Sequence, residues 1–328
     1  LGLSDLLRTA LATTARPRLP EQLPSFEGMD IEGIFEADLR HHWISNAAAD
    51  ALLTRDLVRR WASRGFSIER FIYVYENQPY ERALCWEAQL RFPGAAVVGY
   101  QHARAPWMAI NMYQAPGGEQ AAPQPHRIVT VGAHTARLLT TNGNNPERVK
   151  VGGALQMGGF FRFRNESHSR GSDPCPVVLV AASSRLEEAA ELVDMAVQLL
   201  PEDEGVRFLI KCHPVMPFEA FSALLDRPLP PHVQISDAPI PELISKSSAM
   251  MYTSSITCVQ ALALGVPVVH LRTRFDFDMD PLDSVPEARL EATSLDGLRD
   301  QVRWILENRD EYIATHREQW DRLVDDMY

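Results

Sequence analysis

The stretch AMMYTSSITCVQALALGVPVVHL, residues 249–271, contains a strand, a helix and a second strand in one short run. Both ends of the stretch are continuous apolar segments, which are typical of strands buried on both faces of a parallel sheet. Gly265 follows the last helical residues, and Pro267 opens the second strand. The stretch therefore predicts one βαβ unit of a doubly wound α/β fold.

The same alternation extends in both directions along the chain. Apolar strands are expected at residues 70–76, 95–102, 126–132 and 148–155, and again at 177–183, 206–211 and 232–237, with helical patterns between most of them. We expect two Rossmann-like doubly wound domains facing a cleft. The N-terminal domain would span residues 1–165 and the C-terminal domain residues 172–328. A polar stretch rich in Gly and Ser, residues 158–176, would link them.

Composition limits the function classes. The chain has 328 residues, 45% of them hydrophobic and 23% charged, with a formal net charge of −11. Such acidity disfavours a nucleic-acid binder, which normally carries a basic excess. The four cysteines are widely spaced, which favours reduced thiols and a cytoplasmic protein. No apolar run approaches the roughly 20 residues of a membrane span; peripheral association with the inner face of the cytoplasmic membrane stays open.

The start of the chain is unusual. It begins LGLSDLLRTALATTARPRLP, without an initiator Met and without a signal peptide. We therefore expect a piece of a longer protein, with the N-terminal domain truncated at its start. The sequence does not indicate an oligomeric state.

The turn inside the opening stretch is a candidate anion site. Thr253, Ser254 and Ser255 lie between a buried strand and the helix that follows. Backbone N–H groups at a helix start carry partial positive charge, and the hydroxyls add further donors. The alternative is that these residues only cap a core helix, as Ser and Thr commonly do.

The stretch RFLIKCHPVMP, residues 207–217, is a second candidate. Lys211 and His213 arrive where the strand should end, and Pro214 and Pro217 delay the next helix. A cation and an imidazole there would face the same sheet edge as the serine turn. Alternatively, Lys211 is simply solvated and His213 is a structural histidine.

These two motifs together carry a family resemblance. KCHP, followed about forty residues later by YTSSITCVQALALGVPVV, resembles GT-B glycosyltransferases of bacterial surface polysaccharide (capsule and O-antigen) biosynthesis. The HP and SS pair is shared by bacterial sialyltransferases, Kdo (3-deoxy-octulosonate) transferases and CDP-glycerol-type polyol-phosphate transferases. The resemblance covers residues 70–272, more loosely in the N-terminal half. It implies donor-binding roles for His213, Pro214, Ser254 and Ser255, with Lys211 and Gln260 as neighbours.

The N-terminal half offers candidates for the chemistry. Glu76 ends one predicted strand and His102 ends the next, so both should lie at the ligand-binding edge of the sheet. Glycosyl transfer needs a group that takes the proton of the acceptor hydroxyl, or a carboxylate nucleophile. Glu76 fits either role, and His102 fits a base or a hydrogen-bond donor. The alternative for Glu76 is an acid that stabilises the following helix.

Other side chains are weaker candidates. Trp107 could belong to a sugar platform, whereas core packing is expected for Trp86. Asp38, His41 and His42 could line the acceptor side without metal spacing. RFDFDMDPLD, residues 274–283, alternates Asp as metal-binding DxD sequences do. A solvated loop is the preferred interpretation there, and no metal site is assigned.

The leading hypothesis is a metal-independent, cytoplasmic glycosyltransferase without a cofactor. It would move a sugar from a nucleotide-sugar, preferably a CMP-linked ulosonic acid such as Kdo, to a glycan or lipid-linked glycan. The absence of GxxxxGK[ST], GxSxG, GxGxxG and HExxH motifs removes the main support for several other enzyme classes. Alternatives are a CDP-polyol phosphotransferase, or a non-catalytic nucleotide- or glycan-binding partner in an assembly complex.

Overall fold

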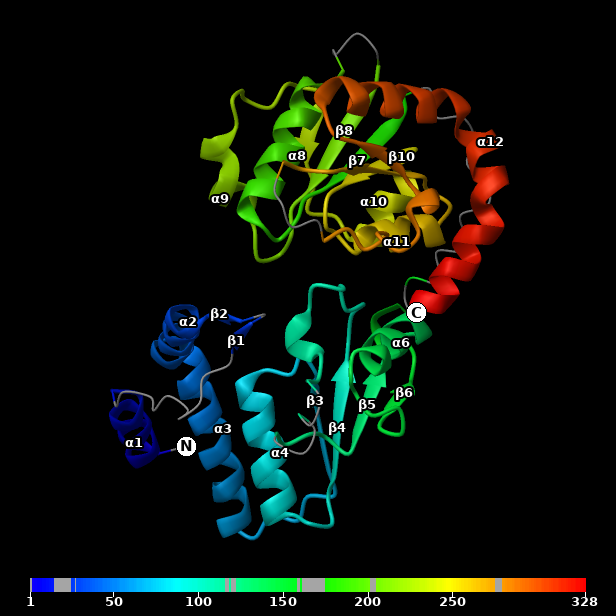
Figure 1. Ribbon diagram of the computed structural model, residues 1–328. Coiled ribbons are helices and arrows are strands. Elements are labelled where there is room, and N and C mark those ends of the chain that lie inside the picture. The colour runs from blue at the N-terminus through cyan, green and yellow to red at the C-terminus, as the bar shows by residue number, and fades with distance from the viewer. Residues whose placement is uncertain are drawn as a thin grey trace. The chain divides into compact units, whose positions relative to one another are not determined.

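The computed structural model describes residues 2–14, 25–26, 28–115, 118, 122–157, 160, 175–200, 205–274 and 279–328. The chain divides into two compact units (Figure 1). Unit 1 contains Leu1–Ala105, Ala109–Val131 and Thr135–Gly152, and unit 2 contains Pro106–Met108, Gly132–His134 and Gly153–Tyr328. The predicted junction at residues 165–172 lies outside the described residues, so the domain limits stay a prediction.

Unit 1 is built on a four-stranded parallel sheet in the order β3-β4-β5-β6. Its strands are β3 (Arg70–Val74), β4 (Ala96–Gln101), β5 (Arg127–Thr130) and β6 (Val149–Val151). The helices α4 (Pro79–Arg91) and α6 (Ala133–Thr141) lie in the crossovers. No described strand pairs with the outer edge of β3, and its Ile72 and Val74 side chains are 69% and 45% exposed.

Three helices and a small hairpin precede this sheet: α1 (Leu3–Thr14), β1 (Ser25–Phe26), β2 (Met29–Asp30), α2 (Glu32–Ile44) and α3 (Asn46–Ser63). Buried carboxylates tie the helices to one another. Glu87 of α4 is fully buried and accepts from Arg59 of α3 at 2.8 Å, and Asp5 of α1 pairs with Arg60. Because a buried charge is costly unless it is paired, these ion pairs fix which helix faces meet.

Unit 2 is built on a six-stranded parallel sheet in the order β12-β11-β10-β7-β8-β9. The strands are β7 (Val177–Ala181), β8 (Arg207–Lys211), β9 (Val233–Ile235), β10 (Ala249–Tyr252), β11 (Val268–Leu271) and β12 (Leu290–Ala292). The chain winds from β7 to β9 in one direction and from β10 to β12 in the other. The switch point therefore lies between β7 and β10. The expectation of two α/β domains with parallel sheets is confirmed.

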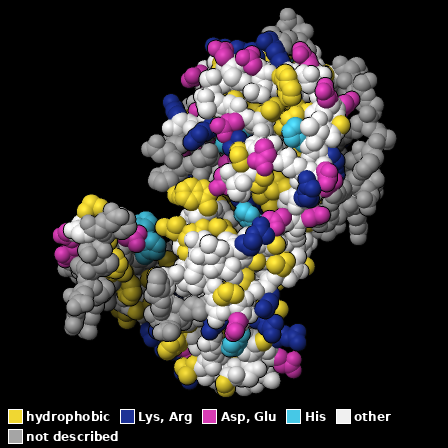
Figure 2. Space-filling model, turned by 45° about the vertical axis from the view of Figure 1, so that its right-hand side comes forward, with side chains coloured by type: hydrophobic (Ala, Val, Ile, Leu, Met, Phe, Trp, Pro, Cys, Tyr) yellow, Lys and Arg dark blue, Asp and Glu magenta, His cyan; other side chains and the backbone are white. Residues whose placement is uncertain are grey.

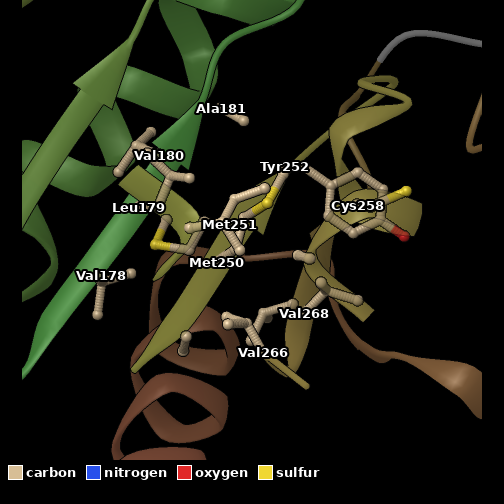
Figure 3. Close-up of a cluster of buried hydrophobic side chains, with 14 of the residues drawn as sticks. Val178, Leu179, Val180, Ala181, Met250, Met251, Tyr252, Cys258, Val266 and Val268 are labelled. Carbon is tan, nitrogen blue, oxygen red and sulfur yellow. The ribbon is translucent and has the colours of Figure 1, made fainter. Parts of the chain in front are cut away.

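The α-helices described in unit 2 are α8 (Leu186–Leu199), α9 (Phe218–Phe221), α10 (Ile240–Lys246), α11 (Thr257–Ala263) and α12 (Leu295–Met327). In Figure 3 side chains of β7 and β10 lie with those of Val266, Val268 and Cys258 in one buried hydrophobic cluster. The four residues of β10 are all fully buried. This accounts for the continuous apolar run at the start of the opening stretch, since both faces of a central strand are covered.

Neither the described helices nor the described surface in Figure 2 has a long uninterrupted apolar region. No described helix is both long and apolar enough to cross a bilayer. On the face shown in Figure 2, acidic and basic side chains are intermingled with apolar ones.

Candidate functional site

The first candidate site lies at the switch point of unit 2. Ser183 follows β7 and Ser254 follows β10, and their Oγ atoms are 2.9 Å apart. Open α/β sheets bind ligands outside the carboxyl ends of the strands on either side of such a point. The serine turn that the sequence singled out is therefore at the position where this fold class binds ligands.

A buried carboxylate shares this position. The Ser254 hydroxyl donates to Glu188 Oε2 at 2.6 Å, and Glu188 Oε1 is 3.2 Å from Arg185 Nη1. The side chain of Glu188 is 3% exposed. Sequence reasoning missed Glu188 and Ser183, although SSRLEE, residues 183–188, has the Ser and Glu pattern of a helix start. The Ser254 proton is thus directed to Glu188, which orients the hydroxyl oxygen.

Ser255 lies just before Ile256, the N-cap of α11, and bonds to the first residue of that helix. Its Oγ donates to Thr257 Oγ1 at 3.0 Å and accepts from the Thr257 N–H at 3.4 Å, and α11 begins at Thr257. This contact favours the capping interpretation for Ser255. Thr253 is 3% exposed, and its Oγ1 makes no hydrogen bond to any described residue.

His213 lies at the end of β8, next to β7. Register pairs Ala181 of β7 with both Lys211 of β8 and Tyr252 of β10. Two strand spacings separate β8 from β10, about 10 Å. The Val215 N–H donates to His213 Nδ1 at 3.3 Å, so the proton is on Nε2. Burial lowers the pKa of His213, which favours a neutral imidazole that donates a hydrogen bond over a cation.

The other donor-site candidates make fewer contacts. Lys211 is partly buried and forms no ion pair with a described residue. Pro214 is exposed in the turn after His213, and Gln260 Nε2 is 3.7 Å from Met157 Sδ. Ser254 is hydrogen-bonded to Ser183 and Glu188. Lys211 and His213 lie at the end of β8, on the other side of β7 from β10. Nucleotide binding by these residues stays a prediction.

The second candidate site is the turn after β3 in unit 1. Asn77 is buried with φ of 57°, a left-handed conformation that non-glycine residues adopt rarely. Its Nδ2 donates to the Asn111 carbonyl at 2.5 Å, and Asn111 Nδ2 donates to the Glu76 carbonyl at 2.6 Å. Backbone held in a sparsely populated conformation by surrounding bonds is a feature of functional sites. Glu76 is thus anchored through its main chain.

Glu81 completes this turn. Its carboxyl group accepts from the Glu76 N–H at 3.1 Å and from the Asn77 N–H at 2.8 Å. Glu81 is the third residue of α4 and is 1% exposed, and burial raises its pKa to about 7. It is therefore Glu81, not Glu76, that stabilises the turn at the start of α4. The Glu at the third helical position was a readable signal that sequence reasoning passed over.

We expect the stability of the protein to depend on the ionisation of Glu81. Its pKa is raised on folding, so the folded state keeps a proton that the unfolded state releases above pH 4.5. The unfolding free energy should then fall as pH rises from about 4.5 to 7, by up to about 1.4 kcal/mol per pH unit. Denaturant titrations of Glu81→Gln from pH 5 to 8 should lack this slope. The exposed control Glu147→Gln should keep this slope. Equal slopes in the wild type, Glu81→Gln and Glu147→Gln would contradict a raised pKa for Glu81 in the folded protein.

His102 lies beside Glu76 at the sheet edge. Register pairs Val74 with Tyr100, so Glu76 and His102 follow neighbouring strands at the same level. Gln101, just before His102, is 2% exposed, and its Oε1 makes no hydrogen bond to a described residue. Both candidates are at the predicted edge, and their catalytic roles stay a prediction.

The aromatic and histidine candidates have mixed outcomes. The core position expected for Trp86 is wrong, because the side chain is 59% exposed on α4. Trp107 is exposed as a platform residue would be. His41 and His42 are exposed on α2, where His42 Nδ1 lies 3.5 Å from Asp38 Oδ1. The described residues contain no group of three His, Cys, Asp or Glu side chains that could hold a metal.

The acidic run at 274–283 is only partly described. Asp276 and Asp278 lie outside the described residues. The solvated loop expected for Asp280 is wrong, because Asp280 is 1% exposed. Its carboxylate accepts from the Tyr252 hydroxyl at 2.8 Å, from the Leu282 N–H at 2.9 Å and from Arg289 Nε at 2.5 Å. Asp280 therefore ties the loop after β11 to the end of β10.

No protein-family model and no curated protein sequence matches the chain. Solved structures do. The UDP-GlcNAc 2-epimerase of Neisseria meningitidis bound to UDP-GlcNAc matches with a TM-score of 0.52 and 15% identity, over 95% of this chain and 83% of that one. Anabaena HepE in complex with UDP-glucose matches with a TM-score of 0.52 and 12% identity, over 100% and 92%. S. aureus MnaA with UDP matches with a TM-score of 0.53 and 12% identity, over 95% of this chain and 80% of that one.

At these identities the similarity shows the fold alone. The chain has the fold of GT-B nucleotide-sugar proteins, which agrees with the coarser part of the resemblance found in the sequence. The three structures are not Kdo or sialyl transferases by name, so they lend no support to that narrower group.

Proposed function

We propose that the chain is a glycosyltransferase that uses a nucleotide-activated sugar. Unit 2 would bind the donor nucleotide at the ends of β7 and β10, and unit 1 would bind the acceptor. The observation that carries the proposal is the pair of serines, Ser183 and Ser254, in hydrogen-bond contact at the switch point. Hydroxyl groups at this position suit the phosphate of a nucleotide-sugar.

The reaction would need no metal ion in this proposal. The acceptor hydroxyl gives its proton to the Glu76 carboxylate, and its oxygen forms the new bond to the anomeric carbon. The bond from that carbon to the donor phosphate breaks, and the nucleotide leaves with the electron pair. The neutral His213 donates a hydrogen bond from Nε2 to the leaving phosphate.

The identity of the donor is the finer part of the proposal. The HP and SS pair favours a CMP-linked ulosonic acid such as Kdo, whereas the names of the similar structures contain UDP-sugars. An acceptor glycan, free or lipid-linked, and a cytoplasmic location at the inner membrane face belong to the same proposal. The base of the nucleotide is the property that an experiment can separate most directly.

Nucleotide titration tests this proposal. We expect CMP to bind in calorimetry more tightly than CDP, UDP or GDP, and Ser254→Ala and His213→Ala each to weaken binding by about tenfold. Ser245→Ala is the matched control, because its hydroxyl bonds to the Glu242 carbonyl of its own helix and to no other described residue. Incubation with CMP-, CDP-, UDP- and GDP-sugars and an oligosaccharide mixture should then yield a product heavier by one sugar.

Each other outcome removes a part of the proposal. Turnover with UDP- or GDP-sugars alone excludes the CMP-linked donor. A product that gains phosphorus indicates a polyol-phosphate transferase. Epimerisation of UDP-GlcNAc without transfer contradicts the transferase assignment, and the absence of any nucleotide binding contradicts the assignment of the site.

A further inference from the structure

Unit 1 contains an open cavity of about 300 Å³ that no step of the proposed reaction uses. Its lining consists of Asp50, Leu53, Thr54 and Leu57 of α3 and Tyr80 of α4. Tyr80 lies four residues after Glu76 in the same connection. Because α3 leads directly into β3, the first half of α3 lies towards the carboxyl end of that strand, where Glu76 is.

The α3 residues form one stripe on the helix, since their spacing is i, i+3, i+4 and i+7. Two leucines supply an apolar floor, and the Tyr80 ring, 37% exposed, supplies a flat wall. Asp50 and Thr54 add a carboxylate and a hydroxyl one turn apart. Mostly apolar lining with a few polar groups is the usual composition of a small-ligand site.

The Tyr80 hydroxyl bonds to Glu81, whereas the other two polar side chains of the cavity have no hydrogen-bond or ion-pair partner among the described residues. Among the described residues, the Asp50 carboxylate forms no ion pair and the Thr54 hydroxyl forms no hydrogen bond. Asp56, an acid on the same helix, is instead paired with Arg8 and Arg55. Threonines elsewhere bond back to their own helices, as Thr140 does to Ala136. Asp50 and Thr54 are therefore available to a ligand.

The charge around the cavity limits what the ligand can be. Burial raises the pKa of Tyr80, and the nearby carboxylates of Glu81, Glu76 and Asp50 raise it further. A phosphate or an acidic sugar would meet like charge there. A pyranose without charge fits better, because its C–H face can pack on an aromatic ring while its hydroxyl groups donate to a carboxylate.

We propose that this cavity binds one uncharged pyranose unit, with the sugar ring on Tyr80 and its hydroxyl groups on Asp50 and Thr54. The inference deepens the proposed function and rests on it, because it makes the cavity the acceptor subsite next to Glu76. A volume of about 300 Å³ is at the lower end for ligand sites, which suits a single sugar unit.

Saturation-transfer NMR on the full chain tests the subsite without any nucleotide. Methyl β-glucoside at millimolar concentration should receive saturation from the protein, and methyl β-glucuronide, which has a carboxylate in place of the C6 hydroxymethyl group, should receive much less. Leu53→Trp, which fills the cavity, should abolish the signal, and Asp50→Asn should weaken affinity by about tenfold. Glu69→Gln, an exposed acid at the opposite end of β3, should leave the signal unchanged.

Additional variants guard against misfolding. Tyr80→Phe keeps the ring and should retain binding, whereas Tyr80→Ala should lose it. Equal signals from the glucoside and the glucuronide, no glucoside signal at all, or an unchanged signal in folded Leu53→Trp would each overturn the inference. A cavity-dependent signal in a chain that binds no nucleotide would leave the subsite in place and remove the transferase. If Leu53→Trp leaves both nucleotide binding and sugar transfer unaltered, the transferase assignment stays and the acceptor subsite is removed.

Discussion

Glu76→Gln should reduce the rate of sugar transfer by at least about 100-fold while leaving nucleotide affinity unchanged. The amide cannot take a proton from the acceptor hydroxyl, although it keeps the size of the carboxylate. The turn itself should persist, because Asn111 and Glu81 hold Glu76 by its backbone carbonyl and N–H rather than by its side chain. Single-turnover kinetics and calorimetry on the same preparation measure the two quantities.

The control for this variant is Glu69→Gln, the same change at the other end of β3. It should transfer sugar at the wild-type rate. Undiminished transfer by Glu76→Gln would remove Glu76 from the mechanism and leave His102, on the neighbouring strand end, as the candidate base. If Glu76→Gln loses both nucleotide binding and sugar transfer, the variant is misfolded or Glu76 belongs to the donor site.

Asp280→Ala should lower the free energy of unfolding by about 3–5 kcal/mol. The buried carboxylate compensates the guanidinium of Arg289, which is only 7% exposed, and accepts a hydrogen bond from the buried Tyr252 hydroxyl. Removing it leaves a buried cation with Glu291 as its remaining carboxylate, 2.8 Å away but one-third exposed. Denaturant-induced unfolding followed by circular dichroism measures the loss.

Two comparisons make this result interpretable. Asp283→Ala, at an exposed position in the same loop, should change stability by less than about 0.5 kcal/mol. The double variant Asp280→Ala with Arg289→Met should recover part of the loss, because the uncompensated charge is gone. A loss for Asp280→Ala no larger than that for Asp283→Ala would show that the buried network contributes little.

The sequence predicted the sheets because their signal is local. Each central strand of unit 2 is a run of buried apolar residues between helix and turn residues, so its position can be read without tertiary information. The hairpin of β1 and β2, and β12, were missed, since strands of two or three residues have no periodicity. The connection after β8 contains only the short helix Phe218–Phe221 and a 3-10 turn at Ser222–Leu224, because propensity alone does not fix helix length.

The site was predicted only in part, for a related reason. Strand alternation places Ser254, His213, Glu76 and His102 at sheet edges without knowledge of the fold in three dimensions. The partners of these residues are not local: Ser254 and Glu188 are 66 positions apart, and Glu76 and Asn111 are 35 positions apart. Such pairs depend on how the elements pack, and a single sequence does not encode that in any short pattern.

The outer edge of β3, with which no described strand pairs, has a consequence for handling the protein in solution. An unpaired strand edge presents free backbone donors and acceptors, and exposed Ile72 and Val74 add apolar surface beside them. Two molecules at high concentration could join such edges and begin to aggregate. Natural proteins block this with a charged side chain on the edge strand, so Ile72→Lys is the substitution of choice for concentrated samples.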